Sequence, residues 1–218
     1  MTRRHISAIA GLAALTAIPL AAQAAKPTQG APTLGARPDP VVFGHAVALS
    51  GKLSGPNAGG KTVVLQADEF PFEGNFGNIG NATTNGAGHY SFSTKPSKNT
   101  RYLARQGNRA SPVVTELVAL RVSLGLSDST PSVGQRVRFS GQACPEHDGA
   151  LVRLQRRRPN GSYGTVQSTS LKDLAGSTCS RYSTRRRISS DGTFRIVVLP
   201  TDGDHARGIS PARHANAH

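Results

Sequence analysis

Arginine is the residue type that gathers most strongly in this sequence, between residues 153 and 187. A guanidinium group offers planar N–H donors that match the oxygens of phosphate and carboxylate groups. If the fold brings these side chains onto one face, we predict a binding site for an anionic polymer. The alternative is an arginine-rich surface that only keeps the protein in solution. The candidate residues are Arg153, Arg156, Arg157, Arg158, Arg181, Arg185, Arg186 and Arg187.

A second candidate is the segment of residues 70–76, in which Phe70, Phe72 and Phe76 stand beside Gly and Asn. Exposed aromatic rings on a loop would form a tip that binds sugar or protein. The competing expectation is that at least two of the rings fold back over a core that has few large apolar residues.

Two short segments combine carboxylates with imidazoles: residues 146–148 (Glu-His-Asp) and residues 202–205 (Asp-Gly-Asp-His). Both segments predict loops, and Asp-Gly is an ordinary turn sequence, so we expect turns here and no metal site. The sequence also lacks the G-x-S-x-G nucleophile motif and the H-E-x-x-H zinc motif. We therefore expect no enzyme, no catalytic residue and no cofactor.

The two halves of the chain repeat the same signals at offsets of 89 to 92 residues. A unit of about ninety residues suits a small β-sandwich domain. We therefore predict two tandem modules, residues 30–118 and 119–213, followed by a disordered tail over residues 214–218. The matched pairs are Gly44 and Gly134, Ser50-Gly51 and Ser140-Gly141, Gly60 and Gly149, Leu65-Gln66 and Leu154-Gln155, Tyr90 and Tyr182, and Tyr102 and Phe194.

Alternating apolar and polar residues predict strands in both halves. In residues 136–143, Val137 and Phe139 alternate with Arg136 and Arg138, so one row of side chains is buried and one is solvated. The chain also contains 24 Gly and 14 Pro, which interrupt it too often for long helices. The predicted fold class is all-β, with two immunoglobulin-like sandwiches of about seven short strands each.

The first 24 residues predict export. The basic pair Arg3-Arg4 precedes the apolar stretch 6–22, and Ala22-Gln23-Ala24 is a small-x-small cleavage site, as in a secretory signal peptide. The apolar stretch is short for a membrane anchor and contains Pro19, so we expect cleavage after Ala24 and no transmembrane segment in the mature chain. The adjacent arginines leave the general and the twin-arginine export routes open.

The only two cysteines, Cys144 and Cys179, both fall in the second half. In an exported protein this pair predicts a disulfide. A loop of that length would stabilise the module by roughly 4 kcal/mol in the chain-entropy model.

Positive charge is concentrated in the same half. The chain carries 26 Lys and Arg against 12 Asp and Glu, and residues 119–218 hold 15 of the basic and 7 of the acidic side chains. This charge predicts an anionic partner such as a phosphate-bearing wall polymer. Specific nucleic-acid binding is not expected, because stacking aromatic residues are scarce near the arginines.

The two predicted modules differ at their last strand. Residues 113–118 are apolar and follow Ser111-Pro112, whereas only Ala-Arg-His-Ala follows Ser210-Pro211. We expect the second sheet to lack a firm edge strand, which would either fray or accept a strand from another chain. Between the modules, residues 118–120 offer no flexible spacer, so we expect an elongated rod with limited bending.

The pattern G…V…SG…P…G…V.LQ, followed by a G.Y/F strand and a closing Ser-Pro, resembles the bacterial immunoglobulin-like repeats of secreted actinobacterial proteins. The resemblance covers about residues 30–215. It implies a binding, spacer or surface-structural module without a catalytic site, and it transfers no functional residues.

Taken together, these patterns predict a secreted, monomeric, non-enzymatic tandem protein at the cell surface. Its expected role is that of a binding or spacer module with weak affinity for an anionic cell-wall polymer or a surface protein. The alternative is an accessory carbohydrate- or protein-binding component of an extracellular hydrolase system.

Overall fold

The structure is a computed structural model that describes residues 29–218, and this part of the chain contains 19 strands and no helix. The predicted all-β fold is confirmed. The predicted signal peptide, residues 1–24, lies outside the described residues. No helix among the described residues is long and apolar enough to cross a membrane.

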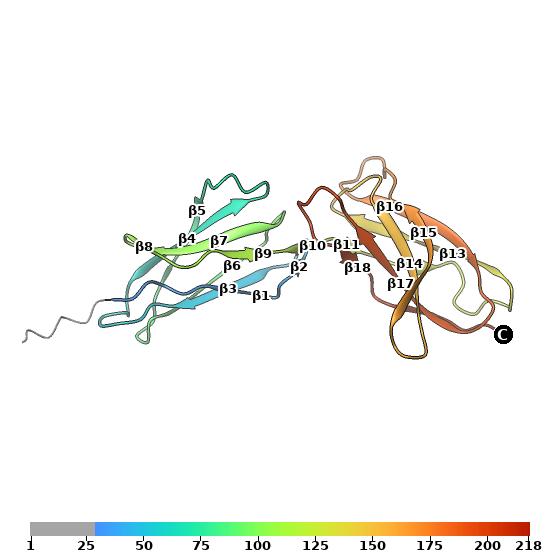
Figure 1. The fold of residues 1–218 in the computed structure, drawn as a ribbon, viewed down its shortest axis with the longest axis horizontal. Coiled ribbons are helices and arrows are strands. Elements are labelled where there is room, and N and C mark those ends of the chain that lie inside the picture. The colour runs from blue at the N-terminus through green and yellow to red at the C-terminus, as the bar shows by residue number, and fades with distance from the viewer. Residues whose placement is uncertain (1–28) are drawn as a thin grey trace, which may run out of the picture.

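Figure 1 shows two lobes arranged end to end. In the first lobe one sheet has the order β1-β3-β6, and the other has the order β5-β4-β7 with β8 and β9 both paired to β7. The strands are β1 (Gly35–Arg37), β2 (Val41–Val42), β3 (Val47–Lys52), β4 (Thr62–Glu69), β5 (Gly77–Thr83), β6 (His89–Thr94), β7 (Thr100–Gln106), β8 (Arg109–Ala110), β9 (Val114–Glu116) and β10 (Val118–Ala119).

In the second lobe one sheet is centred on β13, which pairs with β11, β12 and β16. The other sheet has the order β15-β14-β17, with β18 and β19 both paired to β17. The strands are β11 (Arg121–Val122), β12 (Gly125–Leu126), β13 (Arg136–Cys144), β14 (Leu151–Arg157), β15 (Tyr163–Ser170), β16 (Ser180–Arg187), β17 (Gly192–Leu199), β18 (Gly208–Ile209) and β19 (Arg213–Ala215).

The repeated sequence signals mark repeated structural details. The register of β4 against β5 shifts between Leu65 and Gln66, and the register of β14 against β15 shifts between Leu154 and Gln155. The Leu-Gln pair of each half therefore lies opposite the same bulge, at which the partner strand carries one extra residue, Ile79 in β5 and Val166 in β15.

The glycines at positions 51 and 141 also have a common reason. A Cβ atom at Gly141 would collide with the carbonyl of Ser123 and would lie 2.7 Å from the Tyr182 hydroxyl. Gly51 has the same surroundings in the first lobe, with the tyrosine of β6 in place of Tyr182. In both lobes the tyrosine hydroxyl donates a hydrogen bond across this gap, from Tyr90 to Thr33 and from Tyr182 to Ser123. In both lobes the glycine therefore leaves room for the carbonyl of a residue that flanks a strand and for a tyrosine hydroxyl.

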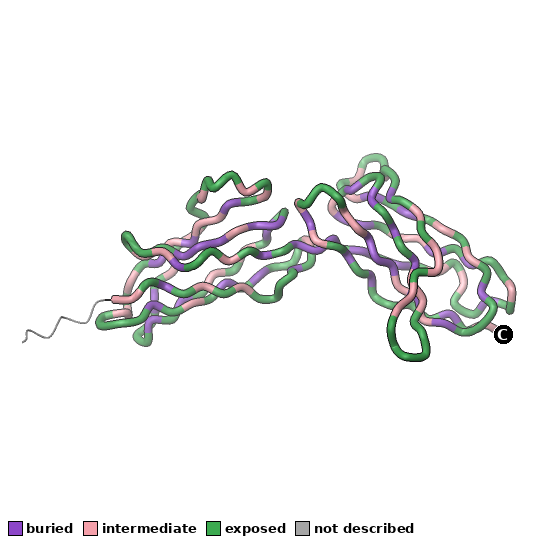
Figure 2. Tube along the Cα trace, viewed as in Figure 1, coloured by how far each residue is buried: buried purple, intermediate pink, exposed green. Residues whose placement is uncertain are grey.

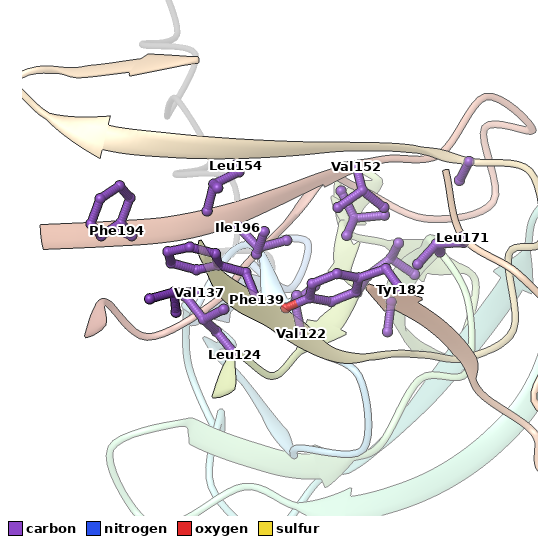
Figure 3. Packing of buried hydrophobic residues seen from close by; sticks show 14 of the residues in the cluster. Val122, Leu124, Val137, Phe139, Val152, Leu154, Leu171, Tyr182, Phe194 and Ile196 are labelled. Atoms are coloured by element: carbon purple, nitrogen blue, oxygen red, sulfur yellow. The ribbon is translucent and has the colours of Figure 1, made fainter. Parts of the chain in front are cut away.

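The cores of the two lobes differ in size. Sixteen buried residues of the second lobe form one continuous cluster, in which Phe139 and Phe194 pack with ring centroids 5.0 Å apart (Figure 3). In the first lobe the buried residues form separate clusters of six and three. Figure 2 shows buried and exposed positions alternating along the strands of both lobes, as the period-two pattern predicts.

The predicted disulfide between Cys144 and Cys179 is present. Cys144 ends β13, and Cys179 immediately precedes the neighbouring strand β16. The bond therefore joins two adjacent strands of one sheet at the end that faces the first lobe.

The disordered tail predicted over residues 214–218 is wrong, and so is the missing edge strand. Residues 213–215 form β19, which pairs with β17 in the same way that β9 pairs with β7. Ala215 is fully buried, and the backbone N–H of His218 donates to Pro131. Backbone hydrogen bonds need no apolar side chain, so this strand leaves no hydrophobic pattern in the sequence.

The joint between the lobes is tied by backbone hydrogen bonds. Strand β10, the last strand of the first lobe, pairs in parallel with β2. Leu120, the residue that follows β10, is buried. The loop between β17 and β18 leans toward the first lobe (Figure 1), where the N–H of Asn99 donates to the carbonyl of Asp204. Its Ala206 bonds both Val118 and Leu120.

Candidate anion-binding surface

The strongest concentration of charge lies on the outer face of the sheet formed by β13 and β16. Arg136 is directly opposite Arg187, and Arg138 is directly opposite Arg185. All four side chains are exposed, because the alternating residues Val137 and Phe139 point into the core. We call Arg136, Arg138, Arg185 and Arg187 the arginine face.

None of these guanidinium groups is neutralised by a carboxylate within the described part of the chain. The ion pairs found among residues 29–218 all join a histidine to an aspartate. Like charges directly opposite each other on a sheet destabilise it by about 0.2–1 kcal/mol per pair. The arginine face therefore carries a small folding cost that a bound anion would remove.

The opposed arginine pairs lie at the end of the sheet that points away from the first lobe. Towards the joint, Arg181 lies opposite Gln142 and donates from Nε to the carbonyl of Asp173 at 3.0 Å. There the exposed carboxylates of Glu146, Asp148 and Asp173 lie within 4.8 Å of one another. An anion is therefore favoured at one end of the face and disfavoured at the other.

The structure does not bring the eight predicted arginines onto one face. Arg153 and Arg157 lie on β14, which belongs to the opposite sheet from the β16 residues Arg181, Arg185 and Arg187. Arg186 pairs with the buried Val137, and its guanidinium donates across the sandwich edge to the carbonyl of Val166 at 2.8 Å. The division depends on which sheet each strand joins. The alternating pattern of the sequence predicts strands but not their neighbours.

Arg156 closes the far end of the core. It pairs with the fully buried Phe194, its guanidinium lies 6.0 Å from the centre of that ring, and it donates to the Ser190 hydroxyl at 2.8 Å. Together with Arg157, Arg158 and His214 it lines a hollow of 750 Å³, which the carboxylate residue Asp191 also lines. This arginine hollow lies at the same end of the lobe as the arginine face, since Ser190 follows Arg187 by three residues.

Two residues of the arginine face, Arg136 and Arg138, were not among the candidates from the sequence. They appeared there only as the solvated row of a predicted strand. The signal that would have found them is the antiparallel pairing of that strand with the arginine run 185–187, which places basic residues side by side.

The phenylalanines of residues 70–76 are all half-buried, and none joins a core cluster. Phe70 and Phe72 meet edge to face at 5.5 Å, and the Arg101 guanidinium lies 4.3 Å from the Phe72 ring. Phe70 also approaches Gly203 of the second lobe. The loop therefore packs mainly on itself and on the joint, so two rings do not cap the core as the competing expectation held.

One further string, residues 55–62, has the spacing of a phosphate-binding loop, with Gly60-Lys61-Thr62 at its end. Such a loop binds phosphate because it opens a helix whose N–H groups converge on the anion. Here the string leads directly into strand β4, so that arrangement of donors does not form.

The two acid and imidazole segments, which the sequence predicts as separate turns, come together at the joint. Nε2 of His147 lies 3.1 Å from Oδ1 of Asp204 and 3.2 Å from Oδ2 of Asp202. Burial alone would raise the pKa of Asp204, but hydrogen bonds with Asp202, His205 and His147 hold that pKa below its usual range. Asp204 therefore carries a negative charge at neutral pH.

Comparison with known protein families finds no matching family, and comparison with curated proteins finds no relative. The resemblance to bacterial immunoglobulin-like repeats therefore stays a prediction from the residues of this chain.

Proposed function

We propose that this chain is an exported, non-enzymatic protein of two tandem immunoglobulin-like modules that binds an anionic polymer at the cell surface. The polymer binds to the far end of the second module. The first module acts as a spacer.

The tandem arrangement is supported by equivalent strands in the two lobes. Strands β3 and β6 correspond to β13 and β16, and β4 and β7 correspond to β14 and β17. The register shift at Leu-Gln and the tyrosine opposite glycine occur in both lobes. Two antiparallel sheets packed over one core, at about ninety residues per unit, are typical of an immunoglobulin-like sandwich.

Anion binding is supported by one observation above all: two pairs of arginines lie directly opposite each other on an exposed sheet, and within residues 29–218 no carboxylate pairs with them. The arginine hollow continues the charge around the end of the lobe. Several separate cationic positions along a surface suit an extended polymer with repeated negative charges better than a single small anion.

Export and surface location are supported by the predicted signal peptide and by the disulfide. Disulfides persist mainly outside the reducing cytosol. The tied joint supports a role as a rigid spacer, because backbone hydrogen bonds link the β17–β18 loop to the first lobe.

The proposal is tested by retention of the mature protein on cell-wall fractions at low and high salt. Retention that is strong at low salt and lost at high salt is the expected result, since counterion release makes polyanion binding salt-dependent. Fractions stripped of phosphate-bearing polymer should retain little protein. Absence of retention at low salt would leave only the spacer role.

The alternative role, as a carbohydrate- or protein-binding accessory of a hydrolase system, predicts a different outcome. Contacts through the rings of Phe72 and Phe76 would give retention that high salt does not weaken. Replacing these two half-buried rings with alanine would then abolish retention, whereas the proposed function predicts that it stays unchanged.

A further inference from the structure

Three side chains of the second lobe, His147, Asp204 and His205, converge on one point at the joint, with their ligand atoms within 4.8 Å of one another. His147 comes from the loop between β13 and β14, and Asp202, Asp204 and His205 come from the loop between β17 and β18. Oδ1 of Asp204 lies 3.1 Å from Nε2 of His147 and 2.8 Å from Nδ1 of His205. The Asp202 carboxylate lies beside this group, 3.2 Å from Nε2 of His147.

The remaining nitrogen of each imidazole contacts a backbone carbonyl. Nδ1 of His147 lies 3.1 Å from the carbonyl of Pro145, and Nε2 of His205 lies 2.8 Å from the carbonyl of Ser97. A carbonyl oxygen only accepts hydrogen bonds, so these two nitrogens carry the hydrogen. In the neutral form of each ring, the nitrogen that faces Asp204 then presents a lone pair.

Two imidazole lone pairs and the Asp204 carboxylate therefore point at the same place, and the Asp202 carboxylate lies next to the His147 lone pair. Such a set of acceptors repels itself unless a positive charge lies among them, either as added protons or as a metal ion. Hydrogen-bonding of the far ring nitrogen to a carbonyl is also the arrangement that orients metal-ligating histidines.

Burial and spacing favour a metal. The His147 and His205 side chains are 3% and 2% exposed, whereas Asp202 is 52% exposed and leaves the site a route to solvent. Neighbouring ligands of a tetrahedral zinc ion lie about 3.4 Å apart, so the contacts of 2.8, 3.1 and 3.2 Å found here would open by about 0.2–0.6 Å around a bound ion, a small movement of the side chains. A hollow of 390 Å³ lined by both histidines opens beside the group.

We propose that His147, His205 and Asp204, with the Asp202 carboxylate beside them, form a binding site for a divalent transition metal of the zinc class that fixes the β17–β18 loop against the first lobe. Two imidazoles and two carboxylates are a donor set suited to zinc and unsuited to magnesium or calcium, which prefer oxygen ligands alone. The site is independent of the arginine face, which lies at the other end of the lobe.

The position of the site gives it a mechanical consequence. The same loop bonds Asn99 of the first lobe twice, through the carbonyl of Asp204 at 2.7 Å and through the carbonyl of Gly203 at 2.9 Å. The Phe43 ring of the first lobe packs against His205 with centroids 5.9 Å apart. A bound metal would hold this loop in place, and the contacts between the lobes with it.

The test is a titration of the purified mature protein, first stripped of metal with a chelator, with Co²⁺ and with Zn²⁺. We expect one metal ion per chain, a visible Co²⁺ absorption typical of tetrahedral coordination, and displacement of Co²⁺ by Zn²⁺. The melting temperature should rise with Zn²⁺ and stay unchanged with Mg²⁺.

Two variants define the site, and a third is the control. Asp202→Asn, at the exposed ligand, should weaken Zn²⁺ binding about 10- to 100-fold without unfolding the chain. His147→Ala should abolish the Co²⁺ absorption, whereas His89→Ala, at an exposed histidine of β6, should leave it unchanged. Circular dichroism checks that each variant is folded.

The proposal is overturned if the wild type binds no stoichiometric Zn²⁺, or if Asp202→Asn and His147→Ala bind it as the wild type does. If the melting temperature does not change with Zn²⁺ but rises as the pH falls, protonated histidines supply the positive charge at this site. That result would equally overturn the proposal.

Discussion

The two lobes share a strand order but are stabilised differently. The second lobe has one continuous core of sixteen buried residues and a disulfide between neighbouring strands. The first lobe has two smaller clusters and no cysteine, and it buries Glu116, of which one carboxylate oxygen lacks a hydrogen-bond partner. The repulsive arginine pairs thus lie on the lobe that has the larger continuous core and the disulfide.

This difference indicates which lobe can tolerate a binding surface made of like charges. A face of like charges costs folding free energy, so the lobe that carries it needs a larger core or a covalent bond. The first lobe has no disulfide, and none of its strand pairings over residues 35–116 places like charges opposite each other. The comparison is therefore testable through stability as well as through binding.

The largest expected effect comes from equivalent core positions. Leu49 and Phe139 occupy the same place in β3 and β13, and both are fully buried. Phe139→Ala should destabilise the second lobe by about 3–5 kcal/mol and Leu49→Ala the first lobe by about 2–5 kcal/mol. Calorimetry should show each substitution lowering the transition of its own lobe; a single shared transition would contradict the division into two cores.

Removing the disulfide should follow in size. Cys144→Ala with Cys179→Ala should destabilise the second lobe by about 2–4 kcal/mol, because the unfolded chain regains the freedom of the closed loop. Denaturant unfolding of the double variant measures this loss. If the second lobe then becomes less stable than the first, the disulfide is the source of its reserve; an unchanged midpoint would show that the core alone suffices.

Glu116 should make the stability of the first lobe depend on pH. Burial raises its pKa to about 7, and the nearby Asp39 adds to this, although the N–H of Val41 donates to the carboxylate. The neutral form is thus favoured in the folded state, so stability present below about pH 4.5 is lost as pH rises through 7.

Glu116→Gln should remove that loss and stabilise the first lobe by about 1–3 kcal/mol at pH 8, with little effect at pH 4. Melting curves across this range provide the measurement. Parallel curves for the wild type and the variant at all pH values would show that Glu116 does not titrate as described.

The smallest expected effect concerns the arginine face itself. Arg138→Thr removes one of the opposed pairs and should stabilise the second lobe by about 0.2–1 kcal/mol at low ionic strength. High salt should erase the gain, since it screens exposed charges. If Arg138→Thr instead lowers the stability of the second lobe at low salt, the arginine pair is not repulsive. The larger core and the disulfide would then have no repulsion to offset.

Much of the fold could be predicted from the sequence. The alternation in residues 136–143 predicts β13, and the two cysteines predict their bond, because both are local or compositional signals. The short strand β19 could not be predicted, because three residues held by backbone hydrogen bonds carry no apolar pattern.

The candidate site was less predictable, because it depends on which strands become neighbours. The arginine runs at 156–158 and 185–187 look alike in the sequence, yet they lie on opposite sheets. The meeting of His147 with Asp204 joins residues 57 positions apart in two loops, and no periodicity reports on such a contact.

The most direct measurement of the central claim is a titration of the mature protein with inorganic polyphosphate at several salt concentrations. It compares two quadruple variants of equal net charge: Arg136, Arg138, Arg185 and Arg187 to Gln, and the exposed Arg37, Arg105, Arg109 and Arg121 to Gln. We predict that the first variant loses about 100-fold or more in affinity at low salt and most of the salt dependence, while the second stays within about threefold of the wild type. Equal losses in the two variants would contradict the claim, because binding would then follow net charge and not the arginine face.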